Sequence, residues 1–207
     1  MIGYYNYTVI LTYLGLISGM SGIFLSINSH PVLALICLMF AGLCDGFDGY
    51  VARTKKNRTA AEKKFGIELD SLADLVCYGV LPSVILYNIG MNTWYYIIIL
   101  ITYTLSALIR LAYFNVMEDI RQGKTEECRK SYEGLPVTTI SLILPLFYPV
   151  IMHFTAFANV LFAILMIIIA YLFLSKITIP KFKLKGLIVL IVIGIIEIVL
   201  LVLPKVL

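Results

Sequence analysis

Charged side chains are scarce in this chain of 207 residues. Only 14% of the residues are charged, 61% are hydrophobic, and the mean hydropathy is +0.97. Soluble domains carry about 25% charged residues, so the composition argues against an ordinary soluble domain and indicates an integral membrane protein. The net charge is only +4. The basic residues form no stripe of the kind that binds nucleic acid, so we expect no nucleic acid among the partners.

The chain also lacks the patterns of a metal–thiolate site and of a separate soluble domain. Its four cysteines form no C-x-x-C pair, and it has only two histidines. We interpret the cysteines as small buried or lipid-facing residues. The polar connections between the apolar segments are too short to house a soluble domain, so any chemistry must take place in the membrane or at its surface.

Seven apolar segments are long enough to cross a bilayer as helices, which takes about 20 residues. We expect an all-α integral membrane protein, a polytopic helical bundle that forms a single transmembrane catalytic domain over residues 1–207. Six spans remain possible if the last segment lies on the membrane surface or is re-entrant. The predicted segments are 7–27, 32–53, 67–89, 93–117, 135–154, 157–175 and 186–203.

Three polar connections, 53–64, 118–134 and 176–185, hold 14 of the 16 Lys and Arg residues. With seven spans all three lie on one side of the membrane. The positive-inside rule makes that side the cytoplasm. We therefore predict a protein of the cytoplasmic membrane with a cytoplasmic N-terminus.

Small residues recur at spacings of three and four along the first predicted helix. This pattern favours close packing of helices in a membrane. The residues are Gly15, Ser18, Gly19, Gly22 and Ser26.

Two consecutive predicted helices carry aspartates on one face each. Asp45 and Asp48 are three residues apart in the second, and Asp70 and Asp74 are four apart in the third. Residues at these spacings are neighbours on a helix surface. All four lie in the half of the bundle nearer the cytoplasm, so we expect them to meet in one polar cavity, together with Arg110 of the fourth helix.

Four carboxylates in hydrocarbon need partners, and only Arg53 and Arg110 are placed to help. Divalent cations would cancel the remaining charge, and an all-oxygen ligand set favours Mg²⁺, Mn²⁺ or Ca²⁺ over zinc. Four aspartates can hold two ions, an arrangement that serves phosphoryl transfer. The neighbouring glycines and alanine would let a phosphate or nucleotide approach the backbone. Two alternatives remain: aspartates that only tie helices together, and a cation transporter.

These residues resemble the motif of the CDP-alcohol phosphatidyltransferase family, D-x-x-D-G-x-x-A-R followed by G-x-x-x-D-x-x-x-D. All eight fixed positions match across residues 45–74. The spacer between the two halves holds 12 residues here, where many family members have 8, and we expect the extra residues in a charged loop. The matching residues are Asp45, Asp48, Gly49, Ala52, Arg53, Gly66, Asp70 and Asp74.

The resemblance implies the family's membrane fold, a homodimer, and the transfer of a phosphatidyl group from a CDP-linked lipid to an alcohol with release of CMP. It implies that Asp45, Asp48, Asp70 and Asp74 lie at a site for Mg²⁺ or Mn²⁺. Asp74 is the candidate base for the acceptor hydroxyl. The candidates for binding the CDP moiety are Gly49, Ala52, Arg53 and Gly66.

The sequence E-L-D-S-L-A-D over residues 68–74 is similar to the phosphatidylserine synthase branch of this family. The resemblance therefore implies CDP-diacylglycerol and L-serine as substrates. Arg110 is a candidate for binding the serine carboxylate, and pairing with a site aspartate is an equally good interpretation. Other acceptors (inositol phosphate, glycerol phosphate or choline) and a CDP-archaeol donor remain alternatives.

Overall fold

A computed structural model describes residues 3–55, 57–122, 131–154, 156–180, 194–199 and 201. The described chain is helical apart from its turns and one pair of three-residue strands, so the predicted all-α membrane architecture is confirmed. Residues 194–199 and 201 are also helical, and the rest of the predicted span 186–203 lies outside the described residues. The elements are η1 Tyr7–Val9, α1 Ile10–Ile27, α2 Pro31–Thr54, α3 Ala60–Asp74, η2 Leu75–Val80, α4 Leu81–Asn88, α5 Trp94–Gln122, β1 Ser131–Glu133, η3 Val137–Thr139, α6 Ile140–His153, α7 Ala158–Leu174 and β2 Thr178–Pro180.

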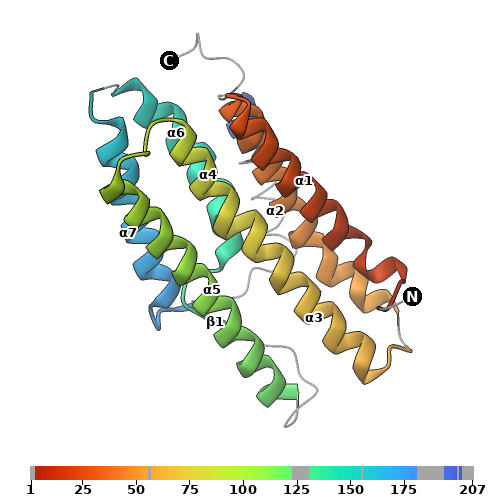
Figure 1. The fold of residues 1–207 in the computed structure, drawn as a ribbon. Coiled ribbons are helices and arrows are strands. Elements are labelled where there is room, and N and C mark those ends of the chain that lie inside the picture. Colours follow the sequence, from red (N-terminus) through yellow and green to blue (C-terminus); the bar gives the residue numbers. More distant parts are fainter. Residues whose placement is uncertain are drawn as a thin grey trace.

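The helices form three groups in space. Helices α1 and α2 pack along each other, α5 packs against α7, and α3, η2 and α4 form one long rod between these pairs (Figure 1). The short strands β1 and β2 pair antiparallel and link the segment after α5 to the end of α7. The rod carries two of the four aspartates into the middle of the bundle.

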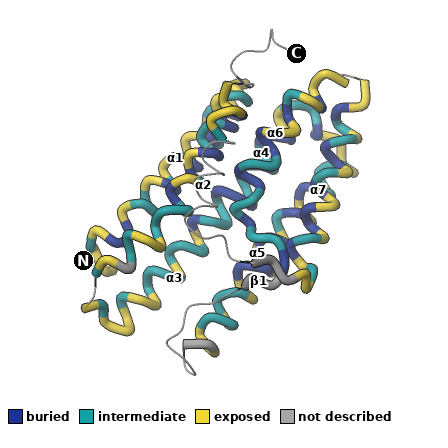
Figure 2. The backbone as a smooth tube through the Cα atoms, turned by 180° about the vertical axis from the view of Figure 1, so that it is seen from behind, coloured by how far each residue is buried: buried dark blue, intermediate teal, exposed yellow. Residues whose placement is uncertain are grey.

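Four helical stretches are long and apolar enough to cross a membrane, and two further apolar helices, 137–153 and 158–174, are shorter. Large apolar side chains cover the outside of the bundle, for example Ile17 at 62% and Tyr171 at 71% exposure. In Figure 2 the buried residues lie on the inward faces of the helices and the exposed ones on the outward faces. A soluble protein does not expose apolar patches of this extent, so this surface is suited to lipid.

The small residues of α1 pack as the spacing predicts. Gly15, Gly19, Gly22 and Ser26 are all buried. A Cβ added at Gly19 would lie only 2.5 Å from the Sγ of Cys77. The glycine is therefore needed for α1 to lie directly against the rod, close to the aspartates.

Two helices begin or end well outside the predicted spans. Helix α3 begins at Ala60 rather than 67, and α5 continues to Gln122 rather than 117. Helix α2 ends at Thr54 and α3 begins at Ala60, so the expected charged loop is confined to the residues between them, and residues 60–65 of the spacer are helical. Hydropathy misses these turns because they are charged.

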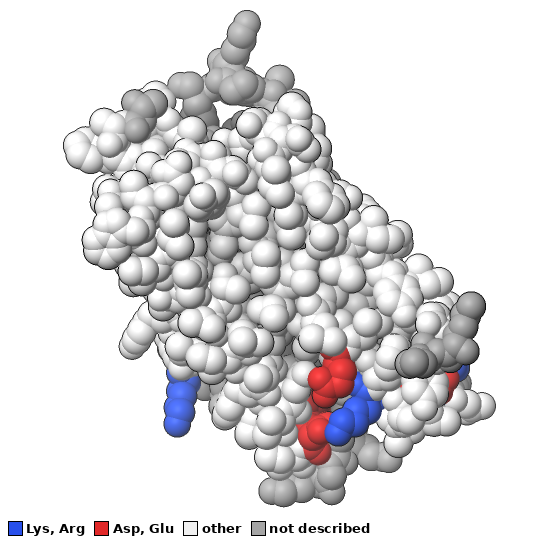
Figure 3. Space-filling model, in the orientation of Figure 1, with Lys and Arg blue, Asp and Glu red and all other residues white. Residues whose placement is uncertain are grey.

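The charged ends of α3 and α5 are joined to each other. Lys64 Nζ lies 2.9 Å from Asp119 Oδ2. Further in, Ser71 Oγ donates to Asn115 Oδ1 at 2.8 Å, and Asn115 Nδ2 donates to Glu68 Oε2 at 3.2 Å. On the face shown in Figure 3, charged side chains gather at this end of the molecule, and the described residues visible at the other end are uncharged.

Candidate functional site

The structure brings three of the four aspartates into one cluster. Asp45 comes from α2, and Asp70 and Asp74 come from the last two turns of α3. One carboxylate oxygen from each lies within 4.8 Å of the other two. This is the meeting of two helix faces that the spacing predicts.

Asp48 lies beside this cluster. Its carboxyl group interacts with the carboxyl group of Asp70 and with the hydroxyl of Thr12. It therefore joins α2 to both α3 and α1.

The four aspartates surround a cavity of about 10 Å³, which is about the room that one water-sized group needs. Helix α1 supplies one wall through Thr12 and Gly15, and the rod supplies Tyr78. We did not predict Thr12 or Tyr78 as site residues. A signal for Thr12 was available, because it lies one turn before Gly15 on the stripe of small residues.

The α-helical geometry of the rod ends at Asp74. The next six residues, Leu75–Val80, form a π-helix, a wider turn that is frequent at functional sites. Its polar backbone groups have partners from α5: Tyr103 Oη donates to the carbonyl of Tyr78 at 2.5 Å, and Thr104 Oγ1 donates to that of Gly79 at 3.1 Å. These hydrogen bonds hold the π-helix, and with it Asp74, against α5.

The ligand set of this cluster fits a hard divalent cation. It offers only carboxylate oxygens, which suit Mg²⁺, Mn²⁺ or Ca²⁺. Among the described side chains, which do not include that of Arg53, no Lys or Arg forms an ion pair with any of the four aspartates. Carboxylates so placed in a membrane protein need a counter-charge, and a divalent cation would supply it.

The predicted nucleotide-binding residues lie on the same two helices. Gly49 is exposed, and a Cβ added there would meet nothing within 4 Å, so the backbone is open to a ligand. Ala52 follows on α2 and is partly buried. The side chain of Arg53 lies outside the described residues. Gly66 is one turn before Asp70, and a Cβ added there would lie 2.8 Å from Nη2 of Arg58.

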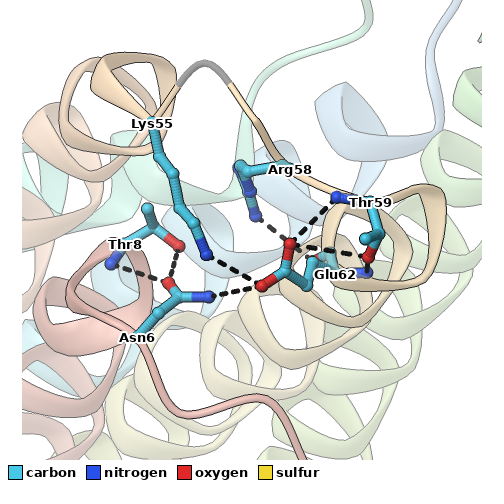
Figure 4. Close-up of polar contacts among 6 residues, drawn as sticks. All are labelled: Asn6, Thr8, Lys55, Arg58, Thr59 and Glu62. Atoms are coloured by element: carbon cyan, nitrogen blue, oxygen red, sulfur yellow. Dashed lines mark hydrogen bonds and ion pairs between the residues drawn. The ribbon is translucent and has the colours of Figure 1, made fainter.

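A group of hydrogen-bonded residues around Glu62 holds the loop between α2 and α3 in place (Figure 4). We call this group the Glu62 cluster. Glu62 Oε1 lies 2.8 Å from Lys55 Nζ, and Asn6 Nδ2 donates to the same oxygen at 3.5 Å. Thr59 and Glu62 form a reciprocal capping box at the start of α3. The cluster ties the segment before α1 to both helices that carry the aspartates. Its members are Asn6, Thr8, Lys55, Arg58, Thr59 and Glu62.

Arg110 occupies a different place from the one expected. Its guanidinium donates to the carbonyl of Phe173 at 3.3 Å and to that of Gly134 at 3.1 Å. It lines a second cavity of about 230 Å³ between α5 and α7, with Tyr113 and Lys176, and it is not among the residues around the aspartates. The prediction of one cavity shared with the aspartates is therefore wrong. The position of Arg110 in the sequence predicts how deep it lies in the bundle. It does not predict which other helix the side chain faces.

Comparison with known proteins identifies the family. The model of the CDP-alcohol phosphatidyltransferase family matches residues 5–203. This chain belongs to that family, and the resemblance that the motif indicated is confirmed.

Several curated relatives share a name. A CDP-diacylglycerol–serine O-phosphatidyltransferase of Saccharomyces cerevisiae is 38% identical over 152 residues, which cover 66% of this chain and 52% of the yeast protein. The protein of the same name from Bacillus subtilis is 35% identical over 161 residues, covering 76% of this chain and 81% of that protein. The archaetidylserine synthase of Methanothermobacter thermautotrophicus is 31% identical over 175 residues, covering 83% and 68%. The matched part of the chain spans about half the length of the yeast relative.

Proposed function

We propose that this chain is a membrane-embedded transferase that moves the phosphatidyl group of CDP-diacylglycerol to L-serine, giving phosphatidylserine and CMP. The observation that carries the proposal is the carboxylate cluster of Asp45, Asp70 and Asp74 on α2 and α3, in a chain that the family model matches over residues 5–203. The names of the relatives support serine as the acceptor.

The four aspartates hold the metal, and we propose two ions of Mg²⁺ or Mn²⁺. When bound, such ions neutralise the charge on the attacking and leaving oxygens of phosphoryl transfer. The ligands of the cluster come from two neighbouring helices, and Asp48 extends the set through its contact with Asp70.

Asp74 is the proposed general base. It accepts the proton of the serine hydroxyl as the oxygen attacks the phosphorus that carries diacylglycerol. The bond from this phosphorus to the bridging oxygen breaks, and CMP leaves with that oxygen. The site at the end of α3 suits this role, because hydrogen bonds from α5 to the carbonyls of Tyr78 and Gly79 hold the π-helix that follows Asp74.

The CDP moiety lies along the open backbone of Gly49, with Ala52, Arg53 and Gly66 as further contacts. Gly49 has free space where a side chain would project. Small residues at these positions let the nucleotide approach the helices closely.

We propose that Arg110 binds the carboxylate of serine before the reaction, because its cavity is not the one that the aspartates line. It is 8% exposed and lines a cavity that is large enough for a small amino acid. Its permanent positive charge there favours an anionic group. The bonds from Arg110 to backbone carbonyls support a second role, the attachment of α5 to α7.

We further propose one transmembrane catalytic domain in the cytoplasmic membrane, with the aspartates facing the cytoplasm. The family match over nearly the whole chain supports the single domain. The basic connections support the orientation.

Purified protein with CDP-diacylglycerol, Mg²⁺ or Mn²⁺ and a panel of alcohols tests the acceptor, with lipid products read by mass spectrometry. We expect serine-dependent release of CMP, and loss of it in Asp48→Asn. Turnover of another alcohol without serine would contradict the assignment. A parallel series with CDP-archaeol tests the donor, because one relative is named an archaetidylserine synthase.

A further inference from the structure

Arg58, in the loop between α2 and α3, has a position that the motif does not explain. Its Nη2 lies 2.8 Å from the place that a Cβ of Gly66 would occupy. The guanidinium therefore rests on the backbone of α3, on the side toward which residue 66 projects. A side chain at position 66 would displace the guanidinium from this place.

That side of α3 is the side of the aspartates. Positions 66, 70 and 74 are four apart and share one helix face. Four residues advance about 6 Å along the axis, so the guanidinium lies about one turn from Asp70, toward the charged end of α3. A diphosphate bound through metal ions at the aspartates would extend toward a cation at this distance.

The guanidinium also has unused hydrogen-bonding capacity. Nη2 donates to the carbonyl of Glu62 at 3.3 Å, a long bond. The buried Nε has no hydrogen-bond partner among the described residues. An arginine held with a buried donor unsatisfied is costly unless a ligand with acceptor oxygens completes the site.

The loop that carries Arg58 is held in place. Thr59, the next residue, caps α3, and Glu62 binds both Lys55 and the backbone N–H of Thr59 (Figure 4). Because the backbone around Arg58 is already held in place, Arg58 loses less conformational freedom when it binds a ligand. The Glu62 cluster thus serves to position Arg58.

We infer that Arg58 is a further donor-substrate residue, which binds the diphosphate of the CDP-lipid through its guanidinium over Gly66. The inference rests on the proposed function, because a nucleoside diphosphate is the ligand. Arginine suits this task, since its planar fork can bind two phosphate oxygens.

The test is the binding of CDP, CMP and cytidine to purified protein with Mg²⁺, measured by calorimetry. We expect Arg58→Ala to lower the affinity for CDP about tenfold to hundredfold, which is the range for one charge-assisted hydrogen bond or bidentate pair. Cytidine has no phosphate, so its affinity should stay the same. Equal loss for all three ligands would show a distorted loop and overturn the inference.

Lys64→Ala is the matched control. It removes one positive charge from the same end of α3, but Lys64 pairs with Asp119 of α5. We expect its CDP affinity to equal that of the wild type. If Lys64→Ala weakens CDP as much as Arg58→Ala does, the effect is general electrostatics and the inference fails.

Two further results separate the possible failures. If the wild type binds no CDP with any metal, the proposed function itself fails. If the wild type binds CDP and Arg58→Ala binds it equally well, only the role of Arg58 fails. Should Arg58→Ala not fold, Arg58→Gln keeps most of the side-chain stem without the charge and decides the same question.

Discussion

Asp74 is the residue on which the proposed chemistry depends most. It is the last residue of α3, and the π-helix begins directly after it. Its carboxylate is part of the cluster with Asp45 and Asp70. A group so fixed by its backbone can accept a proton at a defined point of the cavity, whereas a base on a mobile loop could not.

We predict that Asp74→Asn abolishes CMP release and leaves the protein folded. Asparagine has the same size but cannot accept the proton, and loss of a general base costs about 10²–10⁴-fold in rate. Turnover and thermal unfolding of both proteins in detergent measure the two effects. Near-normal turnover of Asp74→Asn would remove Asp74 from the base role.

A substitution of Gly49 should affect the stability of the protein and its binding of substrate in different ways. A Cβ at this position meets nothing within 4 Å, and alanine favours a helix over glycine by about 0.5–1 kcal/mol. Gly49→Ala should therefore be at least as stable as the wild type. If the CDP moiety lies on this backbone, the KM for CDP-diacylglycerol rises. An unchanged KM would place the nucleotide elsewhere.

At the scale of elements, the start of α3 decides where the loop with Arg58 lies. Thr59 caps the helix, and the side chain of Glu62 reaches back to the N–H of Thr59 at 2.9 Å. The charged first turns extend the rod beyond its apolar part. These turns connect the membrane helices to the basic loop.

We predict that Thr59→Ala lowers the free energy of unfolding by about 1 kcal/mol, the usual cost of losing an N-cap. Thr59→Ser keeps the hydroxyl and is the matched control, with stability near that of the wild type. Unfolding of both variants in detergent provides the measurement. Equal stability of Thr59→Ala and wild type would show that the cap contributes nothing.

The aspartate cluster could be predicted from the sequence because it depends only on helical spacing within two consecutive helices. Predicting that Asp45, Asp70 and Asp74 lie together required no knowledge of contacts between distant parts of the chain. The place of Arg110 could not be predicted, because it depends on α7, which is far along the chain. The contact between Asn6 and Glu62 could not be predicted for the same reason, because the two residues are 56 apart, whereas Thr59 and Glu62 have the local spacing of a capping box.

At the scale of the whole molecule, charged side chains gather at one end of the face shown in Figure 3, and the described residues visible at its other end are uncharged. The long rod of α3, η2 and α4 runs between these ends as 29 helical residues. At 1.5 Å per residue it is about 44 Å long, which exceeds the roughly 30 Å of hydrocarbon in a bilayer. The rod is therefore long enough to cross the bilayer with its two ends on opposite sides.

This length gives a test of orientation. Asn57 precedes the rod, Asn92 follows it, and both are exposed. In a protein that carries Cys128→Ser, the variant Asn92→Cys should react in intact cells with a maleimide that cannot cross the membrane. The variant Asn57→Cys should react only after the membrane is permeabilised, because we propose that the basic loop is cytoplasmic. Labelling of position 57 in intact cells would contradict the proposed orientation. The aspartates would then lie in the outer half of the membrane and not in the cytoplasmic half.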